Sequence, residues 1–173
     1  MSAEAPSHRY YRTKQGRWTS RVAFEVTDWP AFWACRMSLL DRARILYFAW
    51  APKIIGDFVM DTSIDYSPAG LVHHTTRVSR FGMTYFRSEE ELTLESDGAR
   101  VTLTGGQRMF PTLWIARGFG AAGAVVSDDA KGARYELDWI GGRLVQTTRD
   151  EPDGLKLTQE TPWSRATMKL RAA

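Results

Sequence analysis

A chain of 173 residues that is 43% hydrophobic and 25% charged is long enough for one domain to bury its own core, and its composition is that of an ordinary globular protein. The net charge of +3 is modest and no run of five like charges occurs, so we expect no nucleic-acid partner. Cys35 is the single cysteine, which excludes an intrachain disulfide and favours the cytoplasm.

No segment of the chain resembles a targeting or membrane sequence. Residues 1–9 are polar and lack the apolar stretch of a signal peptide. The longest apolar stretch, residues 45–55, contains a proline and a lysine and is too short to span a bilayer, so we expect no stable membrane insertion. We predict a flexible N-terminal arm over residues 1–15 and a single domain over residues 16–173.

The first elements in chain order are a strand and a helical segment. Residues 18–26 alternate between apolar and polar side chains, which is typical of a half-buried strand. Residues 27–30 place an aspartate before Trp-Pro, and this combination favours a helix start. Residues 31–50 are rich in helix formers and predict one long helix, or two short helices broken near Asp41, ending at Pro52.

From residue 57 onward the pattern is almost entirely strand and turn. Alternation over residues 58–65 predicts a strand, and residues 72–87 predict one or two strands with a break at Gly82. Leu92 and Leu94 have the spacing of inward side chains on a further strand. Turn sequences separate these strands at residues 67–70, 96–98, 141–142 and 153–154.

Residues 105–132 interrupt this rhythm, because an apolar stretch is followed by a run of glycine and other small residues. The pattern leaves three conformations open: a lid, a further hairpin with bulges, or a short helix. Phe81, Met83 and Tyr85 are expected on the outer face of their strand. Such a row is either the interface of a homodimer or is covered by residues 105–132.

The C-terminal part of the chain has the clearest alternation. Residues 135–139, 155–161 and 165–171 each show period two, which indicates antiparallel strands with one face inward. Several inward positions are polar, although an unpartnered buried polar group costs roughly 1–3 kcal/mol. A hollow barrel with a wet or ligand-filled cavity explains both features. The side chains expected to contact a ligand are Leu137, Gln146, Thr148, Leu157, Gln159, Thr161, Met168 and Leu170.

One strand, a helical excursion and a long run of antiparallel strands is a layout that resembles the calycins, and more narrowly the intracellular lipid-binding proteins for fatty acids and retinoids. Gly16-Arg17-Trp18 is similar to the Gly-x-Trp that opens the first strand of calycin barrels. FRSEEELTLESDGARVTLTGG resembles that family's middle hairpin, and WIGGRLVQTTRDEPDGLKLTQETPWSRATMKLRA resembles its last three strands. The resemblance covers most of residues 16–172. It implies a mainly β fold, an antiparallel up-and-down β-barrel with a helical lid between the first and second strands.

The resemblance also implies an inward arginine on the antepenultimate strand and an Arg-x-Tyr on the last strand, which together hold a ligand carboxylate. Laid over this chain without gaps, those positions fall on Thr148, Met168 and Leu170, and none of them is charged. Because paired Arg–carboxylate contacts are strong and specific, their absence argues against a deeply buried fatty-acid head group. We therefore expect a mostly neutral ligand, or one whose acid group lies near the opening.

Three side chains are candidates for chemistry inside the barrel. His74 lies on an expected inward face and is a candidate general base or haem ligand, or else a hydrogen-bonded structural residue. Arg80 continues that face and would either bind an anion or pair with Asp150 or Glu89. Tyr135 is a candidate proton donor to a substrate. No second histidine follows at metal-ligand spacing, so no metal site is predicted.

The function expected from these features is the binding of a bulky, mostly neutral hydrophobic small molecule, with no cofactor. One alternative is an isomerase, cyclase or hydratase that acts on a polyketide- or terpene-like substrate, since such catalysis needs little beyond shape and one acid or base. The other alternative is haem binding through His74.

Overall fold

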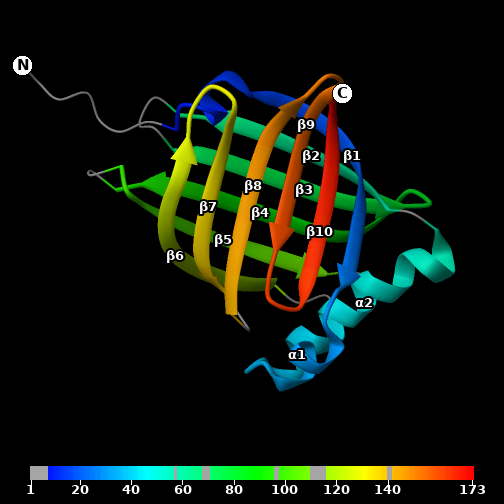
Figure 1. Cartoon of the computed structure of the whole chain (residues 1–173). Helices are drawn as coiled ribbons and strands as arrows, with labels where there is room; N and C mark the ends of the chain where they lie inside the picture. Colours follow the sequence, from blue (N-terminus) through cyan, green and yellow to red (C-terminus); the bar gives the residue numbers. More distant parts are fainter. Residues whose placement is uncertain (1–7, 57, 68–70, 96–97, 110–115, 140–141) are drawn as a thin grey trace, which may run out of the picture.

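The computed structural model describes residues 8–56, 58–67, 71–95, 98–109, 116–139 and 142–173, and these form a closed β-barrel (Figure 1). The strands within these ranges are β1 (Gly16–Val26), β2 (Val59–Tyr66), β3 (Val72–Arg80), β4 (Met83–Leu94), β5 (Arg100–Met109), β6 (Ala116–Asp128), β7 (Gly132–Trp139), β8 (Gly142–Glu151), β9 (Gly154–Glu160) and β10 (Ser164–Ala172). A 3-10 turn, η1 (Tyr11–Thr13), precedes β1, and two helices, α1 (Trp29–Ala34) and α2 (Leu39–Ile55), lie between β1 and β2.

Each strand pairs with its neighbours in sequence, and β1 pairs with β10 to close the barrel. In this closing ladder Trp18 lies opposite Ala172 and Val26 lies opposite Ser164. Antiparallel neighbours need only short turns between them, which is the meander that the turn sequences predict. The prediction of a mainly β, up-and-down barrel with a helical segment between the first and second strands is confirmed.

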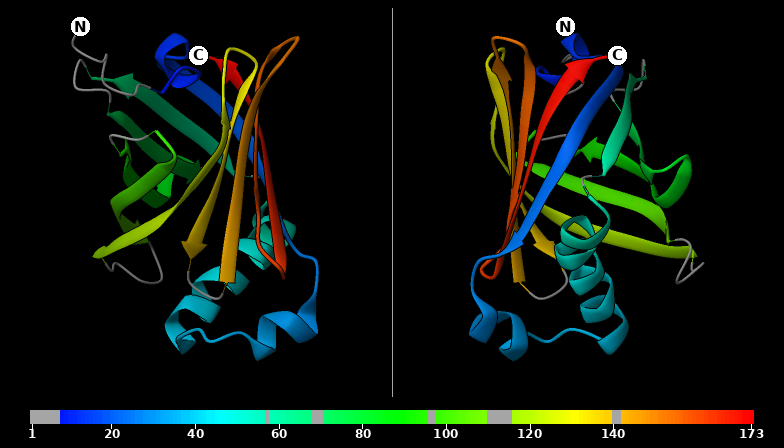
Figure 2. Two further views of the ribbon diagram at one scale, coloured as in Figure 1. Left: turned by 60° about the vertical axis from the view of Figure 1, so that its left-hand side comes forward. Right: turned by 90° about the vertical axis from the view of Figure 1, so that its right-hand side faces the viewer.

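The two ends of the barrel are covered differently (Figures 1 and 2). The helices α1 and α2 lie across the end at which β1 finishes, which we call the helix end. The turn η1 and the residues just before it lie at the opposite end, where β1 begins, which we call the plug end.

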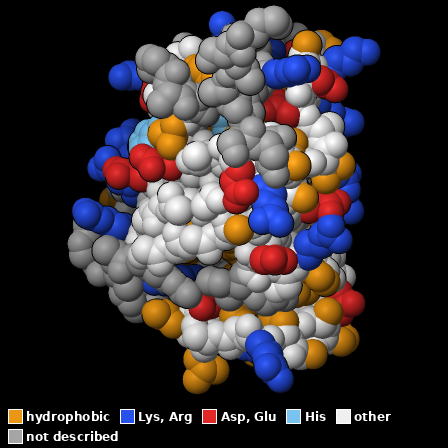
Figure 3. Space-filling model, turned by 90° about the vertical axis from the view of Figure 1, so that its left-hand side faces the viewer, with side chains coloured by type: hydrophobic (Ala, Val, Ile, Leu, Met, Phe, Trp, Pro, Cys, Tyr) orange, Lys and Arg blue, Asp and Glu red, His pale blue; other side chains and the backbone are white. Residues whose placement is uncertain are grey.

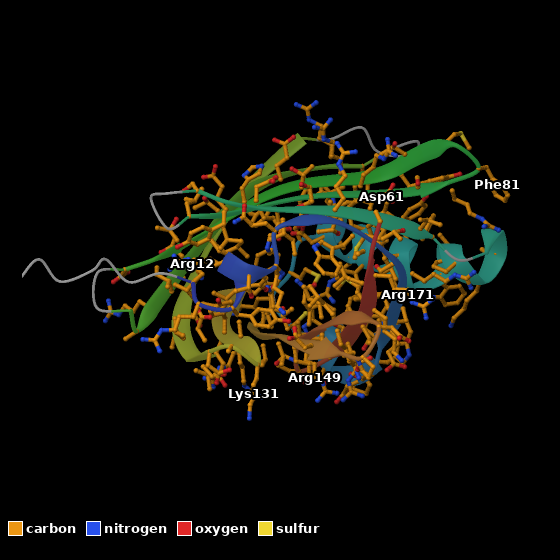
Figure 4. All side chains as sticks on the ribbon, turned by 90° about the horizontal axis from the view of Figure 1, so that it is seen from above. Arg12, Asp61, Phe81, Lys131, Arg149 and Arg171 are labelled. Carbon is orange, nitrogen blue, oxygen red and sulfur yellow. The ribbon has the colours of Figure 1, made fainter. Side chains whose placement is uncertain are left out.

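The inward face predicted from alternation is confirmed on β2. On β2, Met60 and Ile64 are 5% and 3% exposed and face the barrel interior, whereas Asp61 between them is half-exposed. Figure 4, which looks along the barrel, shows Asp61, Arg149 and Arg171 on its outside. The pleat of each strand therefore separates an outer charged face from an inner face of mixed character.

Each helix begins at a capping side chain. Asp28 accepts a hydrogen bond from the N–H of Ala31 at 2.8 Å and caps α1, as the sequence predicts. Ser38 accepts one from the N–H of Asp41 at 3.1 Å and caps α2. The helical segment is therefore two helices, and the break between them precedes Asp41.

The prediction that Pro52 ends the helical segment is wrong, because α2 continues to Ile55. A proline removes one N–H donor and crowds the preceding turn, which is least damaging close to the end of a helix. Termination falls instead on Gly56, whose φ of 83° lies in the left-handed region and whose N–H donates to the Pro52 carbonyl at 3.0 Å.

The described part of the predicted N-terminal arm is packed into the plug end. His8, Tyr10 and Tyr11 are completely buried, at 0% exposure. The Tyr10 hydroxyl donates to Asp150 at 2.9 Å. Isolated aromatic residues in a polar segment have no periodic pattern, so the sequence did not indicate this packing. Residues 1–7 lie outside the described residues, and for them the flexible arm stays a prediction.

Within residues 105–132, the described residues 105–109 and 116–128 belong to β5 and β6, which pair as antiparallel strands, and a further hairpin is one of the three conformations the sequence left open. The register of β6 against β7 shifts between Val125 and Ser127, so the hairpin carries a bulge. Gly105 allows the backbones of β4 and β5 to approach each other closely, because a Cβ at this position would collide with the backbone of β4. Residues 110–115 lie outside the described residues.

A second bulge, between Val78 and Ser79 in the β3–β4 ladder, corrects one expectation about the aromatic row. Phe81 and Met83 are exposed, at 69% and 43%, but Tyr85 is buried at 6% because the bulge shifts the alternation of its strand. Figure 3 shows hydrophobic side chains gathered at the helix end. The homodimer stays a prediction.

Candidate ligand-binding site

The barrel encloses a cavity of about 320 Å³, which lies at the lower end of the range for small-molecule pockets. Most of its wall is apolar. Side chains of this kind include Val22, Phe24, Ile64, Val78, Phe86, Leu103, Trp139 and Leu144. Polar side chains are fewer. An apolar wall with a few convergent polar groups is the usual composition of a ligand site.

Four polar side chains form a hydrogen-bonded chain on the wall of the cavity. The hydroxyl oxygens of Tyr11 and Thr148 lie 2.8 Å apart, and Gln146 Nε2 donates to the Tyr11 hydroxyl at 3.5 Å. Gln159 Nε2 in turn donates to Gln146 Oε1 at 3.1 Å. Burial raises the pKa of Tyr11 to about 12, although its hydrogen bonds with Thr148 and Gln146 act in the opposite direction. These groups are therefore neutral at physiological pH and largely satisfy one another.

His74 lies on β3 close to this chain, with its ring centroid 5.1 Å from that of Tyr11. The side chain is buried, at 6% exposure, and lines the cavity. Among the described residues its Nε2 atom has no hydrogen-bond partner. Burial, followed by the charge of His8, lowers the pKa of His74 to about 4. The imidazole is therefore uncharged near neutral pH and offers an unused polar atom to the cavity.

Glu90 is a further cavity residue, and the sequence analysis missed it. It lies directly opposite His74 in the β3–β4 ladder and accepts a hydrogen bond from the Ser88 hydroxyl at 2.6 Å. Burial raises the pKa of the Glu90 carboxyl, against the opposing effect of Ser88. A signal was available: in the run Glu89-Glu90-Glu91, strand alternation requires the middle residue to share the inward face of Leu92.

A charged pair faces the cavity at the helix end. Asp41, Arg44, Ile45 and Phe48 of α2 line the cavity, at a spacing that places them on one face of the helix. Arg44 Nη1 lies 3.6 Å from Asp41 Oδ1, and the two residues are 8% and 7% exposed. Among the described residues, Arg44 Nε and Nη2 are buried without a hydrogen-bond partner. Sequence analysis placed this segment in a helix but had no means of orienting it.

Seven of the eight residues predicted to contact a ligand line this one cavity. They are Gln146, Thr148, Leu157, Gln159, Thr161, Met168 and Leu170. The eighth, Leu137, is completely buried in the core but does not belong to the cavity wall. Of the three candidates for chemistry, His74 lines the cavity, whereas Arg80 and Tyr135 do not.

Tyr135 is enclosed beneath the buried N-terminal segment at the plug end. Its hydroxyl lies 3.1 Å from His8 Nδ1 and donates to Asp128 Oδ2 at 3.4 Å, while His8 Nε2 contacts the Leu92 carbonyl at 3.0 Å. Burial raises the pKa of Tyr135 well above its ordinary value, with further contributions from Tyr11 and Asp128. Its contacts are those of a structural group that holds the N-terminal segment.

Arg80 lies at the helix end of β3, outside the cavity wall. Its guanidinium lies 4.5 Å from the centre of the Phe81 ring, and a Cβ at Gly56 would come within 2.6 Å of its Nη2. The predicted pairing with Asp150 or Glu89 is wrong. Asp150 lies at the plug end of β8 and contacts Tyr10 and Lys14, and Glu89 contacts Arg87. Arg80 is the last residue of β3 and lies beyond Val78, the last residue of this strand on the cavity wall, next to Phe81 and Gly56.

Comparisons with protein-family models, with curated proteins and with solved structures find no match for this chain. Among the described residues, no cluster of three histidine, cysteine or acidic side chains is arranged to hold a metal ion. No helix within the described ranges combines the length and apolar character needed to cross a bilayer. The chemistry of the cavity is therefore the basis on which a function can be assigned.

Proposed function

We propose that the protein binds a bulky, largely hydrophobic small molecule in the barrel cavity, with an uncharged polar group of that molecule next to His74. The single observation that carries this proposal is the unpartnered Nε2 of His74, among the described residues, at the edge of an apolar cavity. An unpaired buried polar atom costs roughly 1–3 kcal/mol, and a ligand hydroxyl or carbonyl at this position would remove that penalty.

The charges at the plug end support an uncharged ligand group there. The low pKa of His74 and the raised pKa of Glu90, both caused mainly by burial, favour the neutral form of each side chain. The intracellular lipid-binding proteins hold a ligand carboxylate with arginine and tyrosine side chains at positions that correspond to Thr148, Met168 and Leu170 here. In this cavity none of the three residues is charged. We also infer membership of the calycin superfamily, because the closed barrel and the helices after β1 follow its layout.

A second candidate function is acid–base catalysis in the same cavity. One observation favours it: His74 and Glu90 face each other across one ladder, and burial moves the pKa values of the two groups in opposite directions. Such pairs are typical of acid and base groups in active sites. The reaction would be an isomerisation, cyclisation or hydration, with His74 as base and Glu90 as acid.

Native mass spectrometry of the purified protein, beside a denatured control and an absorbance scan, tests the binding proposal. We expect a small molecule that leaves on denaturation. Met168→Lys places a charge on the cavity wall and should abolish the bound species, whereas Thr167→Lys, at the adjacent non-cavity position of β10, should retain it. A Soret band in the absorbance scan would show that the bound molecule is haem, and haem binding would then replace this proposal. A protein that stays unliganded after incubation with retinol, dodecanol and haem would refute it.

A further inference from the structure

Arg44 is the only basic side chain, apart from His74, in the part of the cavity wall that the structure describes. A guanidinium carries five N–H donors in a planar fork. The contact with Asp41 at 3.6 Å is an ion pair that is too long for a hydrogen bond. Since Nε and Nη2 are buried and without a partner among the described residues, the pair balances charge but leaves donors unused.

The position of Arg44 on α2 places these donors at the opposite end of the cavity from His74. Phe48, one helical turn further along α2, packs against Phe86 with ring centroids 5.3 Å apart. Phe86 lies opposite Val78 on β3, which is four residues from His74 and thus about 13 Å from it along the strand. The cavity therefore has unused polar atoms at both ends and a mainly apolar wall between them.

We propose that the ligand has two polar ends, an anionic group bound by the Arg44 fork at the helix end and a hydroxyl or carbonyl group bound by His74 at the plug end. The inference rests on the proposed binding function and adds the class of ligand. A carboxylate matches the guanidinium fork in shape and charge, and hydrogen bonds of this kind are about twice as strong as neutral ones. An apolar body that lies along the mainly apolar wall joins the two ends.

The orientation of the ligand follows from the charges at each end. A carboxylate at the plug end would meet Glu90 and an uncharged imidazole, neither of which stabilises an anion. At the helix end Asp41 offsets the charge of Arg44, but among the described residues Arg44 Nε and Nη2 have no hydrogen-bond partner and can donate to an anionic group. The anionic group is therefore directed towards α2.

Three probes of matched length test the two ends separately: ω-hydroxydodecanoate, dodecanoate and dodecanol, measured by isothermal titration calorimetry against the full chain. Wild-type protein should bind ω-hydroxydodecanoate about ten- to a hundredfold more tightly than dodecanol, which lacks the carboxylate. It should bind ω-hydroxydodecanoate about two- to tenfold more tightly than dodecanoate, which lacks the hydroxyl.

Variants assign each preference to its side chain. Arg44→Gln should remove the preference for the carboxylate while dodecanol still binds, which also shows that the variant folds. Arg44→Lys keeps the charge but not the fork, and should give an intermediate preference. Arg36→Gln makes the same change at an exposed position outside the cavity and should leave all three affinities unchanged. Asp41→Asn should tighten dodecanoate binding about two- to fivefold, because a like charge is removed.

The outcomes separate this inference from the proposed function. Equal binding of dodecanol and ω-hydroxydodecanoate by the wild type, or an unchanged carboxylate preference in Arg44→Gln, would overturn the two-ended ligand and leave cavity binding intact. Failure of all three probes to bind the wild type would overturn both. Loss of the hydroxyl preference in His74→Phe, with the carboxylate preference retained, would support the assignment of the plug end.

Discussion

Replacing His74 with phenylalanine should flatten the dependence of stability on pH in mildly acidic solution. Burial, followed by the nearby charge of His8, lowers the pKa of His74 from 6.5 to about 4 in the folded chain. Between these two values the unfolded chain binds a proton that the folded chain does not. The free energy of unfolding therefore falls as the pH falls through this window.

The size of the effect follows from the shift. One pKa unit corresponds to about 1.4 kcal/mol, so a shift from 6.5 to about 4 can contribute at most about 3 kcal/mol. Between about pH 7 and about pH 5 the wild type should lose about 2 kcal/mol through this residue. Phenylalanine does not titrate, so the variant should not show this loss. It also removes the unpartnered Nε2 and should be no less stable than the wild type near neutrality.

Urea unfolding, followed by tryptophan fluorescence at both pH values, measures the difference. His73→Phe is the matched control, because His73 neighbours His74 on the same strand but does not belong to the cavity wall. The control should still lose stability with acid, because His74 remains and His73 contributes less to its lowered pKa than burial and His8 do. If His74→Phe loses as much stability between the two pH values as the wild type, the proposed protonation linkage is refuted.

Three further predictions, made with four substitutions, test other parts of the structure. Burial raises the pKa of Glu90, so its contribution to stability is lost as the pH rises from its unfolded pKa through its folded pKa. Glu90→Gln should therefore be more stable than the wild type near pH 7 in urea unfolding, and a less stable variant would contradict this. Gly123→Ala should cost about 1–3 kcal/mol because its Cβ would collide with the backbone of β7, whereas Gly120→Ala, with no atom closer than 4.0 Å, should cost nothing or gain about 0.5 kcal/mol. Equal melting temperatures for the two glycine variants would refute the prediction that only the Cβ at position 123 collides with the backbone. Tyr11→Ala should cost about 3–5 kcal/mol in thermal unfolding, because a fully buried aromatic side chain is lost from the plug. A cost below about 1 kcal/mol would show that the plug contributes little.

Interactions between residues close in sequence were sufficient to predict the strands and the start of one helix. In a strand, successive side chains point to opposite faces whatever the strand pairs with, so alternation alone predicted that Gln146, Thr148 and Gln159 face a cavity. The Asp28 cap is equally local, because its carboxylate and the N–H of Ala31 are three residues apart.

Alternation failed where the backbone departs from the regular pleat. The bulge after Val78 is a property of the β3–β4 pair and has no signature in either strand alone. It moved Tyr85 inward, so a residue that alternation assigned to the outer face was misplaced.

Contacts between distant segments decided the remaining parts of the site. His8 meets Tyr135 across 127 positions of the chain, and no periodic pattern near residue 8 indicates that contact. The orientation of α2 likewise depends on its packing against the barrel, and that packing turns Arg44 towards the cavity. The sequence by itself therefore determined a hollow antiparallel barrel and most of its inner face, because pleating is local. Only the tertiary structure decided which end is plugged and where the unpaired polar groups lie, because those depend on contacts between segments far apart in the chain.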